Sequence, residues 1–219
     1  MSRVSAQPNK RHIIAGLDIG SSKVSFAVGS YNGEQLDVIG VGRAPHQGVR
    51  QGVVINVDDT CEAIRKAREE AELMAGTRLS SVYLSVGGVH IESFESQGMV
   101  PIKGQEVSKD SIQKAVEAAQ AVAISKDRQI LHVLPKEFIV DGQRGIQDPT
   151  GMSGVRLECS VHIVTGLHSA IQNLKKCTQK VGLSVEALVL QSLASSLAIL
   201  SPDERELGCS VADIGAGTT

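Results

Sequence analysis

The chain of 219 residues is poor in aromatic side chains and has no large charge excess. Aromatic residues make up 2% of the sequence, tryptophan is absent, and the net charge is −2 at pH 7. Proteins that bind nucleic acid usually present a basic surface and aromatic side chains on which bases stack. We therefore expect no nucleic-acid partner.

Long hydrophobic runs and closely spaced cysteines are also missing. No stretch of 18 consecutive apolar residues occurs, and the polar tail at residues 1–12 has no apolar core. These absences argue against a membrane-spanning helix and a signal peptide, so we expect a cytoplasmic location. The four cysteines lie far apart, which predicts reduced, mostly buried thiols rather than a zinc knuckle.

Two common catalytic patterns are absent as well. The six histidines form no His-x-x-x-His pair, and no Gly-x-Ser-x-Gly turn occurs. His46, His90 and His168 fall at turns or at the ends of expected elements. We therefore expect satisfied or solvated histidines, and we find no support for catalytic-triad chemistry.

What the sequence does have is a repeated turn. The segment Asp18-Ile19-Gly20-Ser21-Ser22-Lys23 is similar to Asp213-Ile214-Gly215-Ala216-Gly217-Thr218-Thr219. Each segment follows an apolar run, residues 13–17 and 209–212, that predicts a strand. Glycine lets the backbone approach an oxyanion closely, and hydroxyl and amide groups donate hydrogen bonds to its oxygens. Two such turns indicate paired phosphate clamps, whereas one alone would be an ordinary strand end.

The aspartates of the two turns, Asp18 and Asp213, would repel phosphate unless a cation lay between them. Mg²⁺ fits, because it prefers oxygen ligands and is commonly held by one or two carboxylates plus a nucleotide. Lys23 can neutralise phosphate as a point charge, with a solvated turn lysine as the alternative. Neither turn matches the Walker loop or the dinucleotide fingerprint.

Around the first turn, the pattern predicts a meander of strands at residues 13–17, 24–29 and 36–41. Asn32-Gly33 favours a tight hairpin turn between the last two. A helix is expected from a capping box at Asp59 and Glu62 to a C-cap at Gly76. Its charged face is expected to be solvated, and comprises Arg65, Lys66, Arg68, Glu69, Glu70 and Glu72.

Residues 88–165 have their own succession of expected strands and a helix, which predicts an inserted subdomain. It comprises a strand near 90–95, a helix starting near Ser108, and strands at 130–140 and 155–165. Pro135 places the third of these elements at a sheet edge or a bulge. Afterwards we expect a helix at 169–181, a strand at 185–190 and a helix at 192–200 that stops at Ser201-Pro202. The expected organisation is a polar tail (1–12), a core lobe (13–87 and 166–202), the insertion (88–165) and the start of a second lobe (203–219).

The paired turns resemble those of the actin, Hsp70 and sugar-kinase superfamily. Within it, the chain is similar to the FtsA family of bacterial cell-division proteins. That closer resemblance is carried by segments 15–24 (AGLDIGSSKV), 72–75 (ELMA), 81–84 (SVYL), 98–102 (GMVPI), 131–135 (LHVLP), 153–156 (SGVR) and 203–208 (DERELG). It implies an α/β, actin-like (ribonuclease H-like) lobe I with an inserted small α+β subdomain, called 1C, and a truncated second lobe.

The resemblance also implies a ligand, Mg²⁺ with ATP, between the two turns. Asp18 and Asp213 would face the metal, and Gln191 matches the position of a polar residue that orients the attacking water. A plain helix-start glutamine is the alternative for Gln191. At most a slow ATPase is implied, not a metabolic enzyme. The remaining residues expected to contact the nucleotide are Gly20, Ser21, Ser22, Lys23, Gly215, Gly217, Thr218 and Thr219.

For partners, the resemblance implies self-association into filaments and a link from the FtsZ ring to the membrane and septal machinery. The location would be the inner face of the cell membrane at the division site. We expect this chain to be the N-terminal part of a longer protein. Membrane contact would come only through a C-terminal amphipathic helix that is absent from this chain. Two alternatives remain: a PilM-like pilus-assembly ATPase, and a sugar-kinase-type phosphotransferase whose substrate-facing base we cannot locate.

Overall fold

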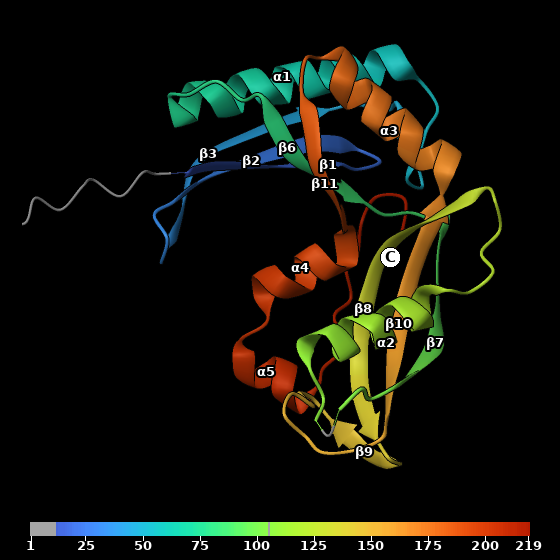
Figure 1. The fold of residues 1–219 in the computed structure, drawn as a ribbon. Helices are drawn as coiled ribbons and strands as arrows, with labels where there is room; N and C mark the ends of the chain where they lie inside the picture. Colours follow the sequence, from blue (N-terminus) through green and yellow to red (C-terminus); the bar gives the residue numbers. More distant parts are fainter. Residues whose placement is uncertain (1–11, 105) are drawn as a thin grey trace, which may run out of the picture. The chain divides into compact units, whose positions relative to one another are not determined.

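The protein comprises two compact units, which are described separately. The structure, a computed structural model, describes residues 12–104 and 106–219 (Figure 1). The first unit contains the chain up to Val89 together with Ser169–Thr219, and the second contains His90–His168. Most of the polar tail expected at residues 1–12 lies outside the described residues.

The first unit is built on a five-stranded mixed sheet with the strand order β11-β6-β1-β2-β3. β1, β2 and β3 form an antiparallel meander, while β6 runs parallel to β1 and β11 parallel to β6. The predicted meander is confirmed. The five strands are β1 (His12–Ile19), β2 (Lys23–Tyr31), β3 (Leu36–Pro45), β6 (Ser81–Val86) and β11 (Ser184–Leu190).

Buried side chains alternate with more exposed ones along β1, β6 and the first half of β2, which is the pattern of a strand. Leu17 in β1 and Phe26 in β2 are among the largest fully buried side chains, and their alternate neighbours point to the other face. The hairpin between β2 and β3 is longer than the tight turn that Asn32-Gly33 favours. It has four residues, because the Asn32 side chain accepts hydrogen bonds from the backbone N–H groups of Glu34 and Gln35.

Two helices, α1 (Val57–Ala75) and α3 (His168–Lys180), cross the same face of this sheet (Figure 1). They touch each other, since the Cys61 thiol lies 3.7 Å from the Cys177 carbonyl oxygen. α1 lies directly on the backbone of β3: a Cβ added to Gly42 would lie 1.9 Å from the Ala67 carbonyl oxygen. Only glycine allows this close packing.

The start of α1 corrects one prediction. Asn56, not Asp59, is the N-cap, and its side chain accepts a hydrogen bond from the Asp59 N–H. Glu62 does not complete a capping box but pairs with Arg65 and Lys66. Asparagine is as good an N-cap as aspartate, and an N-cap at Asn56 makes the helix three residues longer than one at Asp59. The predicted C-cap is confirmed: Gly76 is left-handed, with φ 64°.

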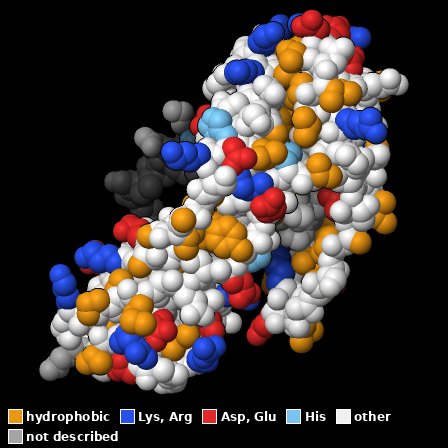
Figure 2. Space-filling view, turned by 90° about the vertical axis from the view of Figure 1, so that its right-hand side faces the viewer, with side chains coloured by type: hydrophobic (Ala, Val, Ile, Leu, Met, Phe, Trp, Pro, Cys, Tyr) orange, Lys and Arg blue, Asp and Glu red, His pale blue; other side chains and the backbone are white. Residues whose placement is uncertain are grey.

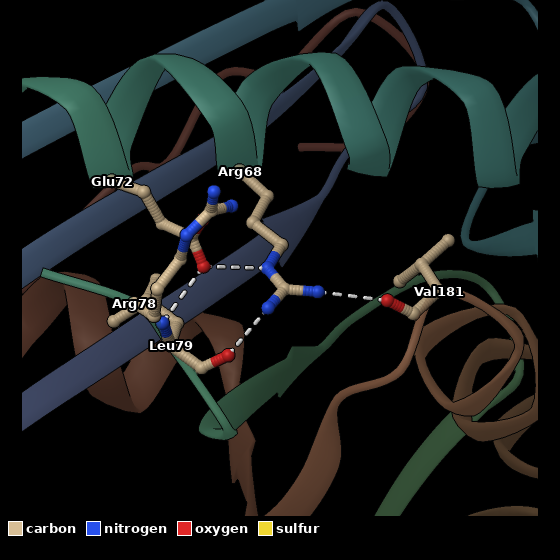
Figure 3. Close-up of polar contacts among 5 residues, drawn as sticks. All are labelled: Arg68, Glu72, Arg78, Leu79 and Val181. Atoms are coloured by element: carbon tan, nitrogen blue, oxygen red, sulfur yellow. Dashed lines mark hydrogen bonds and ion pairs between the residues drawn. The ribbon is translucent and has the colours of Figure 1, made fainter.

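The charged face of α1 is the second correction, because Glu72 is buried. Its carboxylate accepts hydrogen bonds from Arg68 (2.8 Å), Arg78 (3.0 Å) and the Leu79 N–H (2.7 Å) (Figure 3). Arg68 in turn donates to the backbone carbonyls of Leu79 and Val181. This network ties α1 to the segment before β6 and to the turn after α3.

The second unit is a four-stranded antiparallel sheet in the order β7-β10-β8-β9. Its strands are β7 (Ile91–Pro101), β8 (Arg128–Val140), β9 (Gln143–Ile146) and β10 (Arg156–Leu167), and α2 (Lys109–Gln120) packs on β7 and β10. The predicted helix start near Ser108 is confirmed, and the Ser108 side chain caps α2. β9 was not predicted. Pro135 faces Val161 next to a register shift in the pairing of β8 with β10, so the expected bulge is confirmed.

The two ends of the second unit lie beside each other. Ile91 at the start of β7 pairs with Gly166 near the end of β10. Arg128, which is largely buried, donates hydrogen bonds to Thr165 Oγ1 (3.0 Å) and to the His90 carbonyl (2.9 Å), and it pairs with Glu92. One arginine therefore holds the points where the chain enters and leaves this unit.

The last part of the chain departs most from expectation. α4 (Gln191–Ile199) is confirmed, but Ser201-Pro202 also starts a helix, α5 (Pro202–Leu207), through a capping box between Ser201 and Glu204. The strand predicted at residues 209–212 does not form. A strand needs a neighbour for its backbone hydrogen bonds, and among the described residues none pairs with this segment.

On the face shown in Figure 2, charged side chains of both signs are interspersed with apolar side chains. No helix among the described residues is long and apolar enough to cross a bilayer.

Candidate functional site

Both Asp-x-Gly turns line one cavity of about 650 Å³ in the first unit. The first turn joins β1 to β2, and the second lies in the irregular segment after α5. Ten of the eleven residues predicted for the site line this cavity, namely Asp18, Gly20, Ser21, Ser22, Lys23, Gln191, Asp213, Gly215, Gly217 and Thr218. Thr219 instead lines an adjoining cavity of about 690 Å³, which also includes Arg50 and Gln51.

The two turns share one hydrogen-bonding plan. The Gly20 N–H donates to the Lys23 carbonyl at 3.0 Å, and the Gly215 N–H donates to the Thr218 carbonyl at 2.9 Å. In both turns, the glycine that donates this hydrogen bond lies two residues after the aspartate and three residues before the residue whose carbonyl accepts it. The similarity seen in the sequence therefore extends to the backbone, although only the first turn is flanked by strands.

Each aspartate also accepts a hydrogen bond from a serine hydroxyl. Ser85, near the end of β6, donates to Asp18, and Ser195, in α4, donates to Asp213 at 2.8 Å. These bonds fix one carboxylate oxygen of each aspartate. The cavity thus contains two oriented carboxylates, one from each turn.

Direct contact holds the turns together. A Cβ added to Gly217 would lie 2.4 Å from Ser21 Oγ, so the second turn packs on the Ser21 hydroxyl. The same oxygen accepts a hydrogen bond from the Gln51 N–H at 3.2 Å. Gln51 has φ 52°, a left-handed conformation that is uncommon for a residue with a side chain. Such strained residues occur where the surrounding structure fixes the backbone, as it does beside this cavity.

The two carboxylates dominate the electrostatics of the site. Burial raises the pKa of Asp18 above its ordinary value, and the charge of Asp213 adds to this effect. The Ser85 hydrogen bond and Lys23 act in the opposite direction but do not cancel it. Two carboxylates that repel each other in one cavity are a donor set that suits Mg²⁺, which takes oxygen ligands and keeps several waters. The described residues contain no group of three or more His, Cys, Asp or Glu side chains arranged to hold a metal by themselves.

Gln191 is the first residue of α4 and is half-buried. A Cβ on Gly87 would lie 2.3 Å from Gln191 Oε1, so the amide rests against the glycine pair that follows β6. Its side chain lines the same cavity as the two aspartates. This placement brings together a polar amide and the two turns, as the resemblance implied.

Several supporting residues were not predicted. Ser85 and Ser195 have no local motif, because only the fold brings them to the aspartates. Gly52 packs on Gly87, where an added Cβ would lie 2.0 Å from a carbonyl oxygen. His46, which we expected to be uninformative, donates to the first turn.

Comparison with known proteins identifies relatives over nearly the whole chain. A family model described as "SHS2 domain inserted in FTSA" matches residues 88–165. The cell division protein FtsA of Pseudomonas aeruginosa is 45% identical over 208 residues, which are 94% of this chain and 50% of that protein. FtsA of Neisseria meningitidis is 44% identical over 211 residues, covering 96% of this chain and 51% of that protein. The chain spans about half the length of the curated relatives it matches.

A solved structure, that of the PilM-PilN type IV pilus biogenesis complex, is also similar in fold. Its TM-score is 0.57 at 18% identity, and the match covers 89% of this chain and 51% of that chain. At this identity, the likeness concerns the fold alone.

Proposed function

The chain belongs to the FtsA family of cell division proteins, and we propose that its paired turns bind ATP with Mg²⁺. The observation that carries this proposal is the shared hydrogen-bonding plan of the two turns around one cavity that holds two carboxylates. Repeated glycine turns present N–H groups to an anion from two sides. The actin-like α/β fold of the first unit is consistent with this use.

In this proposal each turn has a distinct part. Gly20, Ser21, Ser22 and Lys23 hold one side of the phosphates, and Lys23 adds the positive charge that the second turn lacks. Gly215, Gly217, Thr218 and Thr219 hold the other side. Asp18 and Asp213 face the metal, which would shield the phosphates from their charges.

Gln191 supplies the remaining group. A side-chain amide both donates and accepts hydrogen bonds, so it can orient a water molecule within the cavity. We propose at most a slow ATPase activity, as the resemblance implies. Bound Mg²⁺ would supply charge neutralisation for phosphoryl chemistry.

We extend the proposal to the cellular role by family membership. The protein would assemble into filaments and link the FtsZ ring to the membrane and the septal machinery at the inner face of the cell membrane. Identities of 44–45% over nearly the whole chain support this role. Because the chain spans about half of those relatives, the role belongs to the full-length protein.

The test is nucleotide binding by the longest natural polypeptide that contains residues 1–219, with a fluorescent ATP analogue and Mg²⁺. We expect binding that requires Mg²⁺ and weakens at least about tenfold in Asp18→Asn, since a charge-assisted contact to the metal is lost. The matched control is Glu34→Gln, which removes an exposed charge at the β2–β3 hairpin. Binding without Mg²⁺ dependence, or equal binding by Asp18→Asn, would overturn the proposal.

A second readout of the same variant separates function from folding. Because the pKa of Asp18 is raised in the folded state, its charged form destabilises the fold at pH 7. Asparagine keeps an oxygen that can accept from Ser85 but carries no charge. Asp18→Asn is therefore expected to unfold at a higher temperature than the wild type without nucleotide, while binding nucleotide more weakly.

A further inference from the structure

His46 lies just after β3 and contacts the first turn through its ring atom Nε2. Its side chain is fully buried. Nε2 lies 2.8 Å from the Gly20 carbonyl oxygen, and Nδ1 lies 3.2 Å from the Gly48 backbone nitrogen. In addition, the His46 backbone N–H donates to the Ser22 carbonyl at 3.1 Å. This residue therefore reaches the turn through both its backbone and its imidazole.

These partners fix the tautomer of the ring. The Gly48 N–H can only donate, so Nδ1 must be the acceptor and carries no proton. Nε2 then carries the ring proton and donates it to the Gly20 carbonyl. Asp59 does not compete, because its Oδ2 is 4.0 Å from Nδ1 and already accepts the Gln47 N–H at 2.9 Å.

Holding the Gly20 carbonyl determines where the next N–H points. The Gly20 carbonyl and the Ser21 N–H belong to one peptide group, and no cis peptide bond occurs among the described residues. In a trans peptide the C=O and N–H point in opposite directions. The hydrogen bond from His46 thus directs the Ser21 N–H away from the imidazole. The Gly20 N–H is fixed separately by the Lys23 carbonyl.

We propose that His46 is a positioning residue for the first phosphate turn, which holds the Gly20–Ser21 peptide so that the Ser21 N–H meets the anion. This inference rests on the proposed binding of ATP at the same cavity, which Ser21 lines. The imidazole does not touch the ligand but acts through the peptide. Preorganised N–H donors bind anions more strongly because little ordering remains to be done on binding.

Two substitutions divide the roles of the ring. Glutamine places an amide nitrogen near the position of Nε2 and can still donate to Gly20. Asparagine places an oxygen near the position of Nδ1 and can still accept from Gly48, but it cannot reach Gly20. A purely structural role predicts similar effects on nucleotide binding for both variants, whereas a positioning role predicts that only His46→Gln retains binding.

The experiment measures the affinity for the fluorescent ATP analogue with Mg²⁺, in the longest natural polypeptide that contains this chain. We expect His46→Asn to weaken binding about tenfold and His46→Gln to stay within about threefold of the wild type, as for loss of one hydrogen bond. Equal weakening in both, or none in His46→Asn, would overturn the inference. If the wild type does not bind the nucleotide at all, the proposed function fails first, and the inference fails with it.

A measurement on the wild type covers the case in which His46→Asn does not fold. In ¹⁵N-labelled protein, the His46 ring should show the Nε2–H tautomer, and the Ser21 amide signal should move strongly when Mg²⁺ and ATP are added. A Ser21 amide that stays in place while other signals of the turn move would contradict the proposal. So would an Nδ1–H tautomer.

Discussion

Replacing Glu72 tests whether the buried ion network of α1 stabilises the fold. The Glu72 side chain is 5% exposed and accepts three hydrogen bonds, whereas Glu62 on the same helix is 50% exposed and pairs with the exposed cations Arg65 and Lys66. Removing one partner of a buried, hydrogen-bonded charge leaves the others unsatisfied. Exposed pairs contribute little because water and salt screen them.

The expected magnitudes follow from what each substitution leaves behind. Glu72→Ala leaves the buried Leu79 N–H without an acceptor and Arg68 without its carboxylate, at a cost of about 3 kcal/mol. The cost stays below the largest values for buried pairs, because Arg68 keeps two carbonyl acceptors (Figure 3). Glu72→Gln keeps an acceptor and loses only the charge, at about 1 to 2 kcal/mol. The control Glu62→Gln should cost less than about 0.5 kcal/mol.

Urea denaturation followed by circular dichroism measures these differences as shifts of the midpoint. Burial alone would raise the pKa of Glu72, but the Leu79 N–H, Arg68 and Arg78 outweigh it and hold the pKa below its ordinary 4.5. The stabilisation is therefore present above the unfolded-state pKa and is lost as the pH falls through the lower folded-state value. The gap between the wild type and Glu72→Gln should close with acidification below about pH 4.5. Equal losses for Glu72→Gln and Glu62→Gln, or a gap that does not change with pH, would refute this reasoning.

Three further outcomes are expected. Gly217→Ala should destabilise the protein by about 1 to 3 kcal/mol because its Cβ would overlap Ser21 Oγ, and adding Ser21→Gly should recover part of the loss in thermal unfolding. A thiol reagent such as DTNB should react rapidly with Cys209 alone, because Cys209 is exposed and the other cysteines are buried. Burial also raises the pKa of Cys159 to about 11 and that of Cys177 to about 12. Fast reaction of a second thiol would contradict this prediction. Arg128→Met should speed amide hydrogen exchange at both ends of the second unit, and exchange that changes at one end only would show that Arg128 does not hold both.

Patterns carried by neighbouring residues made much of the fold predictable. The apolar runs of β1 and β2, the helix start near Ser108 and the C-cap at Gly76 each depend on a few adjacent residues, and the structure confirms these predictions. The placement of the two turns in one cavity was predictable because the turn repeats in the sequence. What binds there stays a prediction.

Features that depend on distant partners were not predictable. Glu72 has the same local pattern as its solvated neighbours, and only the approach of Leu79 and Arg78 buries it. Likewise, residues 209–212 have the composition of a strand but no neighbour to pair with among the described residues. Ser85 and Ser195 were missed for the same reason, since a serine that bonds an aspartate 67 or 18 residues away leaves no local signal.

The adjacency of Ile91 and Gly166 has a consequence for how such proteins diversify. A module whose two ends lie next to each other can be gained, lost or exchanged while the host needs only a short connection at one place. The surface of the second unit could thus vary independently of the first unit. For engineering, the same geometry marks a site where a different module with adjacent termini could be grafted in its place.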